Sequence, residues 1–381
     1  MQINDPTIDY EVVRPTHVEI NLKRLTDNFK RIKKQVAPAK MMPILKANAY
    51  GHGLARIAGH MQNIGADYIG VAVLEEGILL RKSGITMPIL VLGGILGNQV
   101  PHFLKYNLTM TASSIESLNQ INQAADRLRM QAKVHLKIDT GMERIGVHDY
   151  NAEPFLKAAM KCHHVFVEGI FSHFANSDAA DLAHARLQLS RFHKVLNYFN
   201  ENGMEPPPMI HMANSGAILQ LPESLFSMVR PGILLYGVYP TCDVKRTIHV
   251  HPALTWKSRV VYFKIIQPNR PVGYGSKWQT DHPVHAVTIP VGYGDGYFRS
   301  MSHRAQVLIQ GKKYPIVGTI SMDQIVVNIE KDSAYSNNEV ILIGEMNGRN
   351  ITCEHLAEWA GTIPYEILTN INTRVPRVYV E

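Results

Sequence analysis

The chain has 381 residues, of which 45% are hydrophobic and 19% charged, a balance typical of a folded globular protein and not of a disordered one. Lysine and arginine number 39 against 32 acidic residues, which gives a formal net charge of +7. The basic residues form no stripe interleaved with aromatic ones, so the sequence disfavours nucleic acid as a partner. The excess of cations suits an anionic small molecule instead.

Signals for export or for a membrane are absent from the sequence. The stretch MQINDPTIDYEV lacks the basic-then-apolar pattern of a signal peptide, and the apolar stretch PILVLGGILG is too short to span a bilayer. Three cysteines, Cys162, Cys242 and Cys353, are far apart and have no CxxC spacing, which predicts free thiols in a reducing compartment. These features predict a cytoplasmic protein.

The first part of the chain alternates short apolar runs with segments of helical period. A chain of this length is long for one hydrophobic core, which predicts two domains. The predicted strands of the first domain are residues 41–46, 68–73, 88–93, 108–112, 133–139, 166–173, 209–212 and 227–230.

Helical segments lie between these strands. The period is clearest at 182–202 and recurs at 115–130, where Ser113 or Ser114 is the expected N-cap. Eight strands, each followed by a helix or a tight turn, predict a closed eight-stranded parallel barrel of the TIM type. A doubly wound open sheet is the alternative, although no GxGxxG follows the first strand.

The pattern changes after about residue 245. The alternating or β-branched segments are residues 255–266, 284–291, 305–309, 314–320, 324–329 and 339–343, and one helix is expected at 353–360. This pattern predicts a mostly antiparallel β domain. The predicted domains are therefore residues 12–245 and 246–381, with residues 1–11 as a candidate addition to the second.

Lys46 lies where the first predicted strand gives way to the glycine-containing turn ANAYGHG. Beside Ile44 and Leu45 its amine would lose hydration, which favours the neutral, nucleophilic form. The alternative interpretation is a structural lysine whose head group reaches solvent at the strand end.

Polar residues follow five of the predicted strands, at the barrel rim where chemistry gathers in such folds. They are Lys46 and Tyr50, Asp139 to Arg144, His173, Asn214-Ser215-Gly216, and Arg230-Pro231-Gly232-Ile233. Considered alone, Arg144 or Arg230 is consistent with an arginine that is exposed to solvent at the rim. His173 alone is consistent with a buried histidine that has a structural hydrogen-bond partner. The Ser215 and Gly232 loops offer backbone N–H groups to a phosphate. A lysine able to form a Schiff base beside a phosphate site predicts pyridoxal phosphate.

Eight motifs, in order along nearly the whole chain, resemble those of alanine racemase. They are ILKANAYGHG, KIDTGMERIG, FSHFANSD, HMANSGA, VRPGILLYG, VGYGSKW, VGYGDGYFR and GTISMDQ. The resemblance implies a pyridoxal-phosphate barrel followed by a β domain, and a homodimer in which each β domain completes the partner's active site. It also implies interconversion of L-alanine and D-alanine, which supplies D-alanine for peptidoglycan.

The resemblance assigns roles to residues at matching positions. Lys46 is similar to the Schiff-base lysine, Arg230 to the arginine facing the pyridine nitrogen, and Tyr274 to the catalytic tyrosine that arrives from the other chain. His173 and His211 are similar to a hydrogen-bonded set behind that tyrosine. The cofactor-binding candidates are Lys46, Tyr50, His173, Asn214, Ser215, Arg230, Gly232 and Ile233. The substrate-binding candidates are Arg144, Met322 and Tyr293, and the entrance candidates are Asp178, Tyr293 and Arg299. No metal ligand is expected.

Racemisation needs a base on each face of the α-carbon. We expect Lys46 on the face that exchanges with D-alanine and Tyr274 on the face that exchanges with L-alanine. A tyrosine is a poor base at neutral pH without nearby cations, and we expect His173 and Arg230 to supply that positive field. Because an arginine does not readily give up a proton, it should leave the pyridine nitrogen unprotonated and so limit transamination.

The sequence departs from the family pattern at three positions. Thr373 replaces a phosphate-contacting tyrosine, which leaves serine open as a second substrate, Glu143 stands where glycine is common, and Ser321 stands where cysteine is frequent. Lys137 matches a lysine that is carbamylated in some members of the family. The carbamate there contacts the arginine whose position Arg144 occupies in this sequence. Two further alternatives are a cofactor carrier without turnover and a related barrel decarboxylase, which typically has a glutamate at the position of Arg230.

Overall fold

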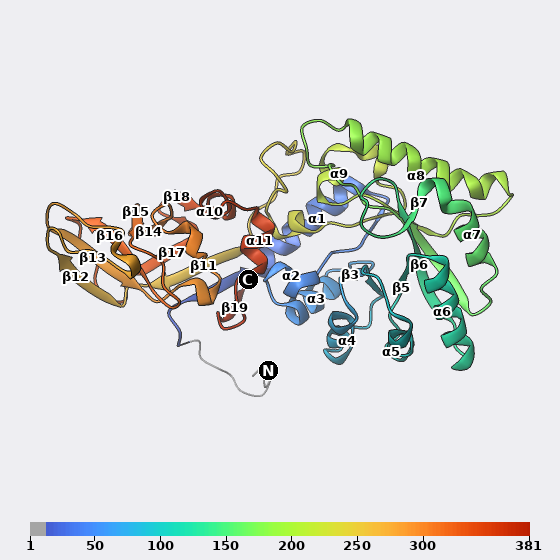
Figure 1. The fold of residues 1–381 in the computed structure, drawn as a ribbon, viewed down its shortest axis with the longest axis horizontal. Helices are drawn as coiled ribbons and strands as arrows, with labels where there is room; N and C mark the ends of the chain where they lie inside the picture. Colours follow the sequence, from blue (N-terminus) through green and yellow to red (C-terminus); the bar gives the residue numbers. More distant parts are fainter. Residues whose placement is uncertain (1–12) are drawn as a thin grey trace. The chain divides into compact units, whose positions relative to one another are not determined.

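The computed structural model describes residues 13–381, which form two compact units (Figure 1). One unit is Arg24–His251, and the other combines residues 13–23 with Pro252–Glu381. The domain boundaries expected from the sequence stay a prediction, and the candidate addition of residues 1–11 lies outside the described part. No helix in the described part is long and apolar enough to cross a membrane.

The unit Arg24–His251 is a closed parallel barrel. The strands that form the barrel are β2 (Lys40–Met41), β3 (Ile69–Val71), β4 (Ile89–Val91), β5 (Met110–Ala112), β6 (Ala132–Asp139), β8 (Val165–Phe171), β9 (Met209–His211) and β10 (Met228–Val229). The short strand β7 (Val147–His148) pairs with the end of β6. Parallel pairings run β5–β6–β8–β9–β10–β2, and β3 pairs with β4. The bridges Ile44↔Gly70 and Leu90↔Thr109 join these two sets and close the circle. The predicted eight-stranded barrel is therefore confirmed, and the open doubly wound sheet is wrong.

Helices form the outer layer of this unit (Figure 1). They are α1 (Leu22–Val36), α3 (Leu54–Asn63), α4 (Leu74–Lys82), α5 (Val100–Lys105), α6 (Ile115–Arg127), α7 (Ala152–Met160), α8 (Ala183–Glu201) and α9 (Ser215–Gln220). Helix α8 matches the periodic segment 182–202 and buries Leu189, Phe192 and Phe199. Helix α6 begins after Ser114, whose Oγ accepts a hydrogen bond from Ser117 N at 3.0 Å, so Ser114 is the N-cap.

The second unit is built on one large, mostly antiparallel sheet, drawn mainly in orange and red in Figure 1. Its strands are β1 (His17–Asn21), β11 (Leu254–Arg259), β12 (Tyr262–Ile266), β13 (Val284–Ile289), β14 (Gln306–Ile309), β15 (Lys312–Val317), β16 (Ile325–Glu330), β17 (Glu339–Met346), β18 (Arg349–Ile351) and β19 (Arg377–Val380). Their order is β12–β13–β16–β15–β14–β17–β11–β1–β19, with β18 beside β17, and only β1–β19 is a parallel pair. Trp256 and Tyr297 are fully buried and pack edge to face in its core.

Two details of this unit differ from the sequence prediction. The expected strand 255–266 is two strands, because β11 pairs with β17 whereas β12 pairs with β13 at the far edge of the sheet. The expected helix at 353–360 is α10 (Cys353–Ala360), but a second helix, α11 (Pro364–Thr369), follows it. Proline at the first helical position, where no N–H is needed, starts that helix.

Candidate active site

Lys46 begins a left-handed turn instead of ending a strand. The turn α2 (Lys46–Tyr50) starts after the bridge at Ile44, so the predicted strand 41–46 extends too far. Ala47, Asn48, Ala49 and Tyr50 have φ values of 52°, 56°, 52° and 51°. Left-handed backbone costs an L-residue about 1–2 kcal/mol. Four such residues in a row must therefore be held by tertiary contacts.

Glu76, in the first turn of α4, provides such a contact. Its Oε1 accepts a hydrogen bond from Ala47 N at 2.7 Å, and its Oε2 accepts one from Ala72 N at 2.8 Å. Asn48 Oδ1 accepts a further bond from Leu54 N at 2.8 Å. The turn is thereby tied to the loop after the second barrel strand. This fixes the backbone from which the Lys46 side chain extends.

The amine of Lys46 is biased toward its neutral form. Burial lowers its pKa below the ordinary lysine value, the positive charges of Arg144 and Arg230 lower it further, and Glu76 opposes them. A neutral amine is a nucleophile and a base, whereas a lysine reaching into solvent would keep its charge. A lowered pKa is what the chemical interpretation of Lys46 requires, and its catalytic role stays a prediction.

Arg230 is buried at the end of the last barrel strand and is held by four acceptors. Its Nη1 donates to His211 Nδ1 at 2.7 Å, and its Nη2 donates to the carbonyl oxygens of Ser172 and Met212 and to His173 Nδ1 at 3.1 Å. Burial lowers the pKa of Arg230 to about 9, so it remains a cation at neutral pH. These bonds fix the plane of the guanidinium.

His173 is neutral, contrary to the expectation that it adds a positive charge. Burial, followed by the charge of Arg230, lowers the pKa of His173 well below its ordinary value. Because its Nδ1 accepts from Arg230, a neutral His173 carries its proton on Nε2. His211 is shifted in the same direction for the same two reasons. The positive field of this cluster comes from Arg230.

The residues expected at the phosphate form a compact group. Ser215 Oγ accepts hydrogen bonds from Gly232 N at 2.9 Å and Leu234 N at 3.3 Å, so the Gly232 amide is engaged rather than free as expected. A Cβ on Gly232 would lie 2.7 Å from the Tyr50 hydroxyl, so any larger residue would displace the Tyr50 side chain. Asn214 caps α9 through Oδ1, which accepts from Ala217 N at 3.1 Å. Its contact with a cofactor stays a prediction.

Arg144 is positioned by the loop after β6. The carboxylate of Asp139 accepts four backbone N–H bonds, from Gly141, Met142, Glu143 and Arg144, at 2.8, 2.9, 3.2 and 3.1 Å. Burial acts to raise the pKa of Asp139, but these bonds outweigh it and lower the pKa below its usual range. The carboxylate therefore stays ionised and shapes the turn that carries Arg144.

Lys137 is buried in the barrel near these residues. Its Nζ lies 4.9 Å from the centroid of the Phe171 ring and donates to Ile138 O at 3.2 Å. Burial, then the charges of Arg230 and Arg144, lowers the pKa of Lys137 to about 7. Two lysines and two arginines thus influence one another at one rim, which makes it a site for an anion.

The other unit carries the remaining candidates. Tyr274 is 71% exposed and stands between Gly273 and Gly275, which have φ values of 73° and 76°. Its carbonyl oxygen accepts a hydrogen bond from Thr319 Oγ1 at 2.9 Å. A tyrosine between two such glycines is presented to solvent by a fixed turn. Its catalytic role stays a prediction.

Met322 and Tyr293 are brought together in that unit. Gly294 N donates to Met322 O at 2.9 Å, and Tyr293 N donates to Ser321 O at 3.0 Å. Both Tyr293 and Met322 are about half exposed, at 43% and 52%. The Arg374 guanidinium also donates to Met322 O at 3.3 Å. The roles expected for Asp178, Arg299 and Thr373 stay predictions.

Sequence reasoning missed two acidic residues of the barrel, Glu76 and Glu168. Glu76 follows the strand predicted at 68–73 by three residues, so the rule that selected Lys46 could have found it. Glu168 lies inside β8, where a carboxylate in an otherwise apolar parallel strand is itself a signal for a buried partner. Its Oε2 accepts from Tyr68 OH at 2.6 Å and lies 3.4 Å from His135 Nε2.

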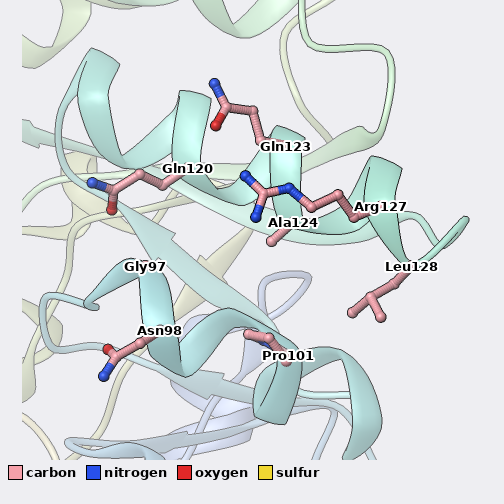
Figure 2. Close-up of a pocket in the computed structure, with 8 residues that line it drawn as sticks. All are labelled: Gly97, Asn98, Pro101, Gln120, Gln123, Ala124, Arg127 and Leu128. Atoms are coloured by element: carbon pink, nitrogen blue, oxygen red, sulfur yellow. The ribbon is translucent and has the colours of Figure 1, made fainter.

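A separate hollow lies in the helical layer, beside α5 and α6 (Figure 2). Its volume is about 490 Å³, and it is lined by Gly97, Asn98, Pro101, Gln120, Gln123, Ala124, Arg127 and Leu128. Figure 2 shows the amides of Gln120 and Gln123 and the guanidinium of Arg127 on α6, across from the segment that carries Asn98 and Pro101. None of these residues belongs to the cationic rim, which is the part of the barrel that carries Lys46, Lys137, Arg144 and Arg230. The candidate site therefore does not lie in this hollow.

Comparison with known proteins extends over both units. A family profile described as "Alanine racemase, N-terminal domain" matches residues 20–240, and one described as "Alanine racemase, C-terminal domain" matches residues 253–379. The alanine racemase of Carboxydothermus hydrogenoformans is 42% identical over 370 residues, which are 97% of this chain and 100% of that protein.

Solved structures agree with the sequence comparison. The alanine racemase of Clostridium difficile 630 superposes with a TM-score of 0.91 at 37% identity and covers 97% of each chain. The alanine racemase of Bacillus anthracis with bound L-Ala-P superposes with a TM-score of 0.92 at 30% identity, covering 98% of this chain and 96% of that one. Because both profiles and these relatives match it across almost its full length, this chain belongs to the alanine racemase family.

Proposed function

We propose that this chain interconverts L-alanine and D-alanine with pyridoxal phosphate bound at the barrel rim. The observation that carries the proposal is the lowered pKa of Lys46, which begins a left-handed turn. Burial lowers this pKa, and the nearby positive charge of Arg230 contributes to the shift. The D-alanine would supply cell-wall peptidoglycan, as in the family, and the enzyme would act in the cytoplasm. The residues 12–245 would bind the cofactor and residues 246–381 would complete the site.

The residues at the rim fit this cofactor. Lys46 would hold its aldehyde carbon, and Arg230 would face its ring nitrogen. Tyr50, Ser215 and the Gly232–Ile233 loop would hold its phosphate, where the missing Cβ of Gly232 leaves room beside the Tyr50 hydroxyl. The surrounding cations would balance the phosphate charge.

The cofactor, when bound, withdraws electron density from the α-carbon of an amino acid joined to it, and so makes the α-proton acidic. Lys46 would exchange that proton on the face that leads to D-alanine, and Tyr274 on the opposite face. Arg230 stays protonated at neutral pH. It would therefore donate a hydrogen bond to the ring nitrogen without transferring its proton to it. Arg144 and the backbone of Met322 would bind the substrate carboxylate, with Tyr293 and Met322 restricting the side chain.

The second base would come from a second copy of the chain, and two features support a homodimer. Tyr274 is 71% exposed, whereas proton transfer at an α-carbon needs a site that excludes bulk water. Strand β12, at the edge of its sheet, exposes Tyr262, Phe263 and Ile265 by 57%, 38% and 51%. Exposed apolar residues on an edge strand are typical of a surface covered by another chain.

The test is the loss of the α-deuterium label from each alanine enantiomer. In Tyr274→Phe, wash-out from L-alanine should collapse far more than wash-out from D-alanine, whereas Tyr335→Phe, equally 71% exposed in the same unit, should retain both. Equal loss in both directions would contradict the assignment of faces. Absence of turnover with cofactor bound would indicate a carrier, and release of carbon dioxide would indicate a decarboxylase.

Substrate breadth is a second question, raised by Thr373. A threonine is shorter than tyrosine, so the pocket would have room for a hydroxymethyl side chain. Comparing kcat/KM for alanine and serine, in the wild type and in Thr373→Tyr, measures this directly. We expect alanine to be preferred and Thr373→Tyr to reduce serine turnover more than alanine turnover.

A further inference from the structure

We propose that Glu168 is a positioning residue for the active site, acting through a directed chain of hydrogen bonds from Glu168 through His135 and His211 to Arg230. Glu168 lies toward the N-terminal ends of the barrel strands, since its carboxylate contacts Tyr68 and Thr109, which precede β3 and β5. Arg230 lies past the C-terminal end of β10. This series of hydrogen bonds therefore runs through the barrel interior, along the direction of the strands.

Two of the three links in this series of hydrogen bonds are short and buried. Arg230 Nη1 lies 2.7 Å from His211 Nδ1, and His211 Nε2 lies 2.7 Å from His135 Nδ1. His135 Nε2 lies 3.4 Å from Glu168 Oε2, which is the longest link. Both imidazoles are fully buried, and the His211 ring stacks on Phe171 at 4.8 Å between centroids. Neither ring has bulk water as an alternative partner.

The chemistry of the end groups sets the direction of every bond. A guanidinium only donates, so His211 Nδ1 must accept, and a neutral His211 then carries its proton on Nε2 and donates to His135 Nδ1. His135 must in turn carry its proton on Nε2, toward Glu168. A carboxylate only accepts, which agrees with that direction. If the far end were a donor, the chain could reverse and place two donors between His211 and Arg230.

The electrostatics agree with this assignment. Burial acts to raise the pKa of Glu168, but hydrogen bonds from His135 and Tyr68 lower it to about 2, so the group is an acceptor at neutral pH. Lys133 favours the same ionised form. Burial lowers the pKa of His135, as it does for His211, so both rings are neutral, and a neutral ring has one donor and one acceptor.

Tyr68 and Thr109 also contact the carboxylate, but they do not belong to the series of hydrogen bonds that leads to Arg230. The Tyr68 hydroxyl donates to Glu168 at 2.6 Å and lies 2.6 Å from Thr109 Oγ1, which is itself 3.3 Å from Glu168. Tyr68→Phe removes one of these bonds and leaves the acceptor in place. It is therefore the matched control for loss of the acceptor itself.

The direct test is the tautomer of each histidine in the cofactor-free full-length chain. In protein labelled with 15N-histidine, with signals assigned by replacing His135 and His211 singly with glutamine, both rings should have protonated Nε2 and unprotonated Nδ1. Glu168→Gln, whose amide can donate, should add the Nδ1-protonated form at one or both rings, and Tyr68→Phe should not. Proton on Nδ1 of either ring in the wild type would overturn the proposal, even if Glu168→Gln did not fold.

A second readout concerns the cofactor and rests on the proposed function. A guanidinium that loses its fixed acceptor should bind pyridoxal phosphate less well, and we expect the Kd of Glu168→Gln to rise about tenfold, equivalent to about 1.4 kcal/mol. Tyr68→Phe should stay near the wild-type value. Unchanged tautomers in Glu168→Gln would overturn the positioning role, whereas correct tautomers in a protein that never binds the cofactor would instead contradict the proposed function.

Discussion

Replacing Glu76 tests whether the left-handed turn at Lys46 depends on one carboxylate. Glu76→Ala removes the bonds to Ala47 N at 2.7 Å and Ala72 N at 2.8 Å. Hydrogen bonds to a charged group contribute about 1.5–3 kcal/mol each, and partial exposure puts these at the lower end. The loss should therefore be about 2–4 kcal/mol. This is comparable with the roughly 4–8 kcal/mol that four left-handed residues cost together.

The expected result is a less stable protein that binds pyridoxal phosphate weakly. Urea unfolding of the cofactor-free chain measures the free energy of unfolding, and absorbance titration measures cofactor affinity. Glu75→Ala is the matched control, because Glu75 is the exposed neighbour in the same helix turn. If Glu76→Ala and Glu75→Ala had the same stability and the same affinity, the turn would be held by other contacts and the reasoning would be refuted.

Three further predictions concern the cations of the rim. Lys46→Ala should abolish the absorbance band of the lysine-bound cofactor, and an unchanged spectrum would remove the covalent role of this amine. Arg230→Glu should increase the pyruvate formed per racemisation event, because a carboxylate would favour a protonated ring nitrogen; no increase would refute the nitrogen argument. Burial and then Arg230 lower the pKa of Lys137 from 10.5 to about 7. Between these pH values the unfolded chain binds more protons than the folded one, so the free energy of unfolding should rise with pH. Lys137→Met should flatten this rise in urea titrations at pH 7 and pH 9, and equal slopes would contradict the buried amine.

The barrel could be predicted because its strands are local features. Each is a short apolar run between helical segments, and parallel strands buried on both faces need little beyond that pattern. The N-cap Ser114 was predictable for the same reason, since a serine before a periodic segment offers its hydroxyl to the first turn. Helix α11 was not, because its six residues, Pro364–Thr369, are too few to show a helical period.

The backbone of the turn at Lys46 could not be predicted from the neighbouring sequence. The sequence does not predict three consecutive left-handed residues at Ala47, Asn48 and Ala49. Alanine disfavours this backbone conformation, and none of the three residues is glycine. The turn is instead contacted by Glu76, which lies 29 residues after Ala47 and accepts a hydrogen bond from its backbone N–H. A strand that continued through residue 46 would have aimed the amine differently. The backbone expected at residue 46 was therefore wrong, while the role expected for its side chain stays a prediction.

The charge state of His173 could not be predicted from the sequence either. A histidine after a strand next to arginine-bearing loops is consistent with either protonation state until its burial is known. In the folded chain, burial and Arg230 both disfavour the imidazolium, and the Arg230 donor occupies Nδ1. A neutral His173 with its proton on Nε2 then has a hydrogen-bond donor at that atom and is not a second cation.

The rim concentrates positive charge and yet leaves it available to a ligand. The two carboxylates beside it, Asp139 and Glu76, direct their oxygens to backbone N–H groups instead of to the lysines and arginines. Ion pairs between these groups would have neutralised the cations before a ligand arrived. Lys46 instead relieves repulsion by a lowered pKa, which also makes it reactive. The same cluster of cations that suits an anionic ligand therefore also lowers the pKa of the Lys46 amine.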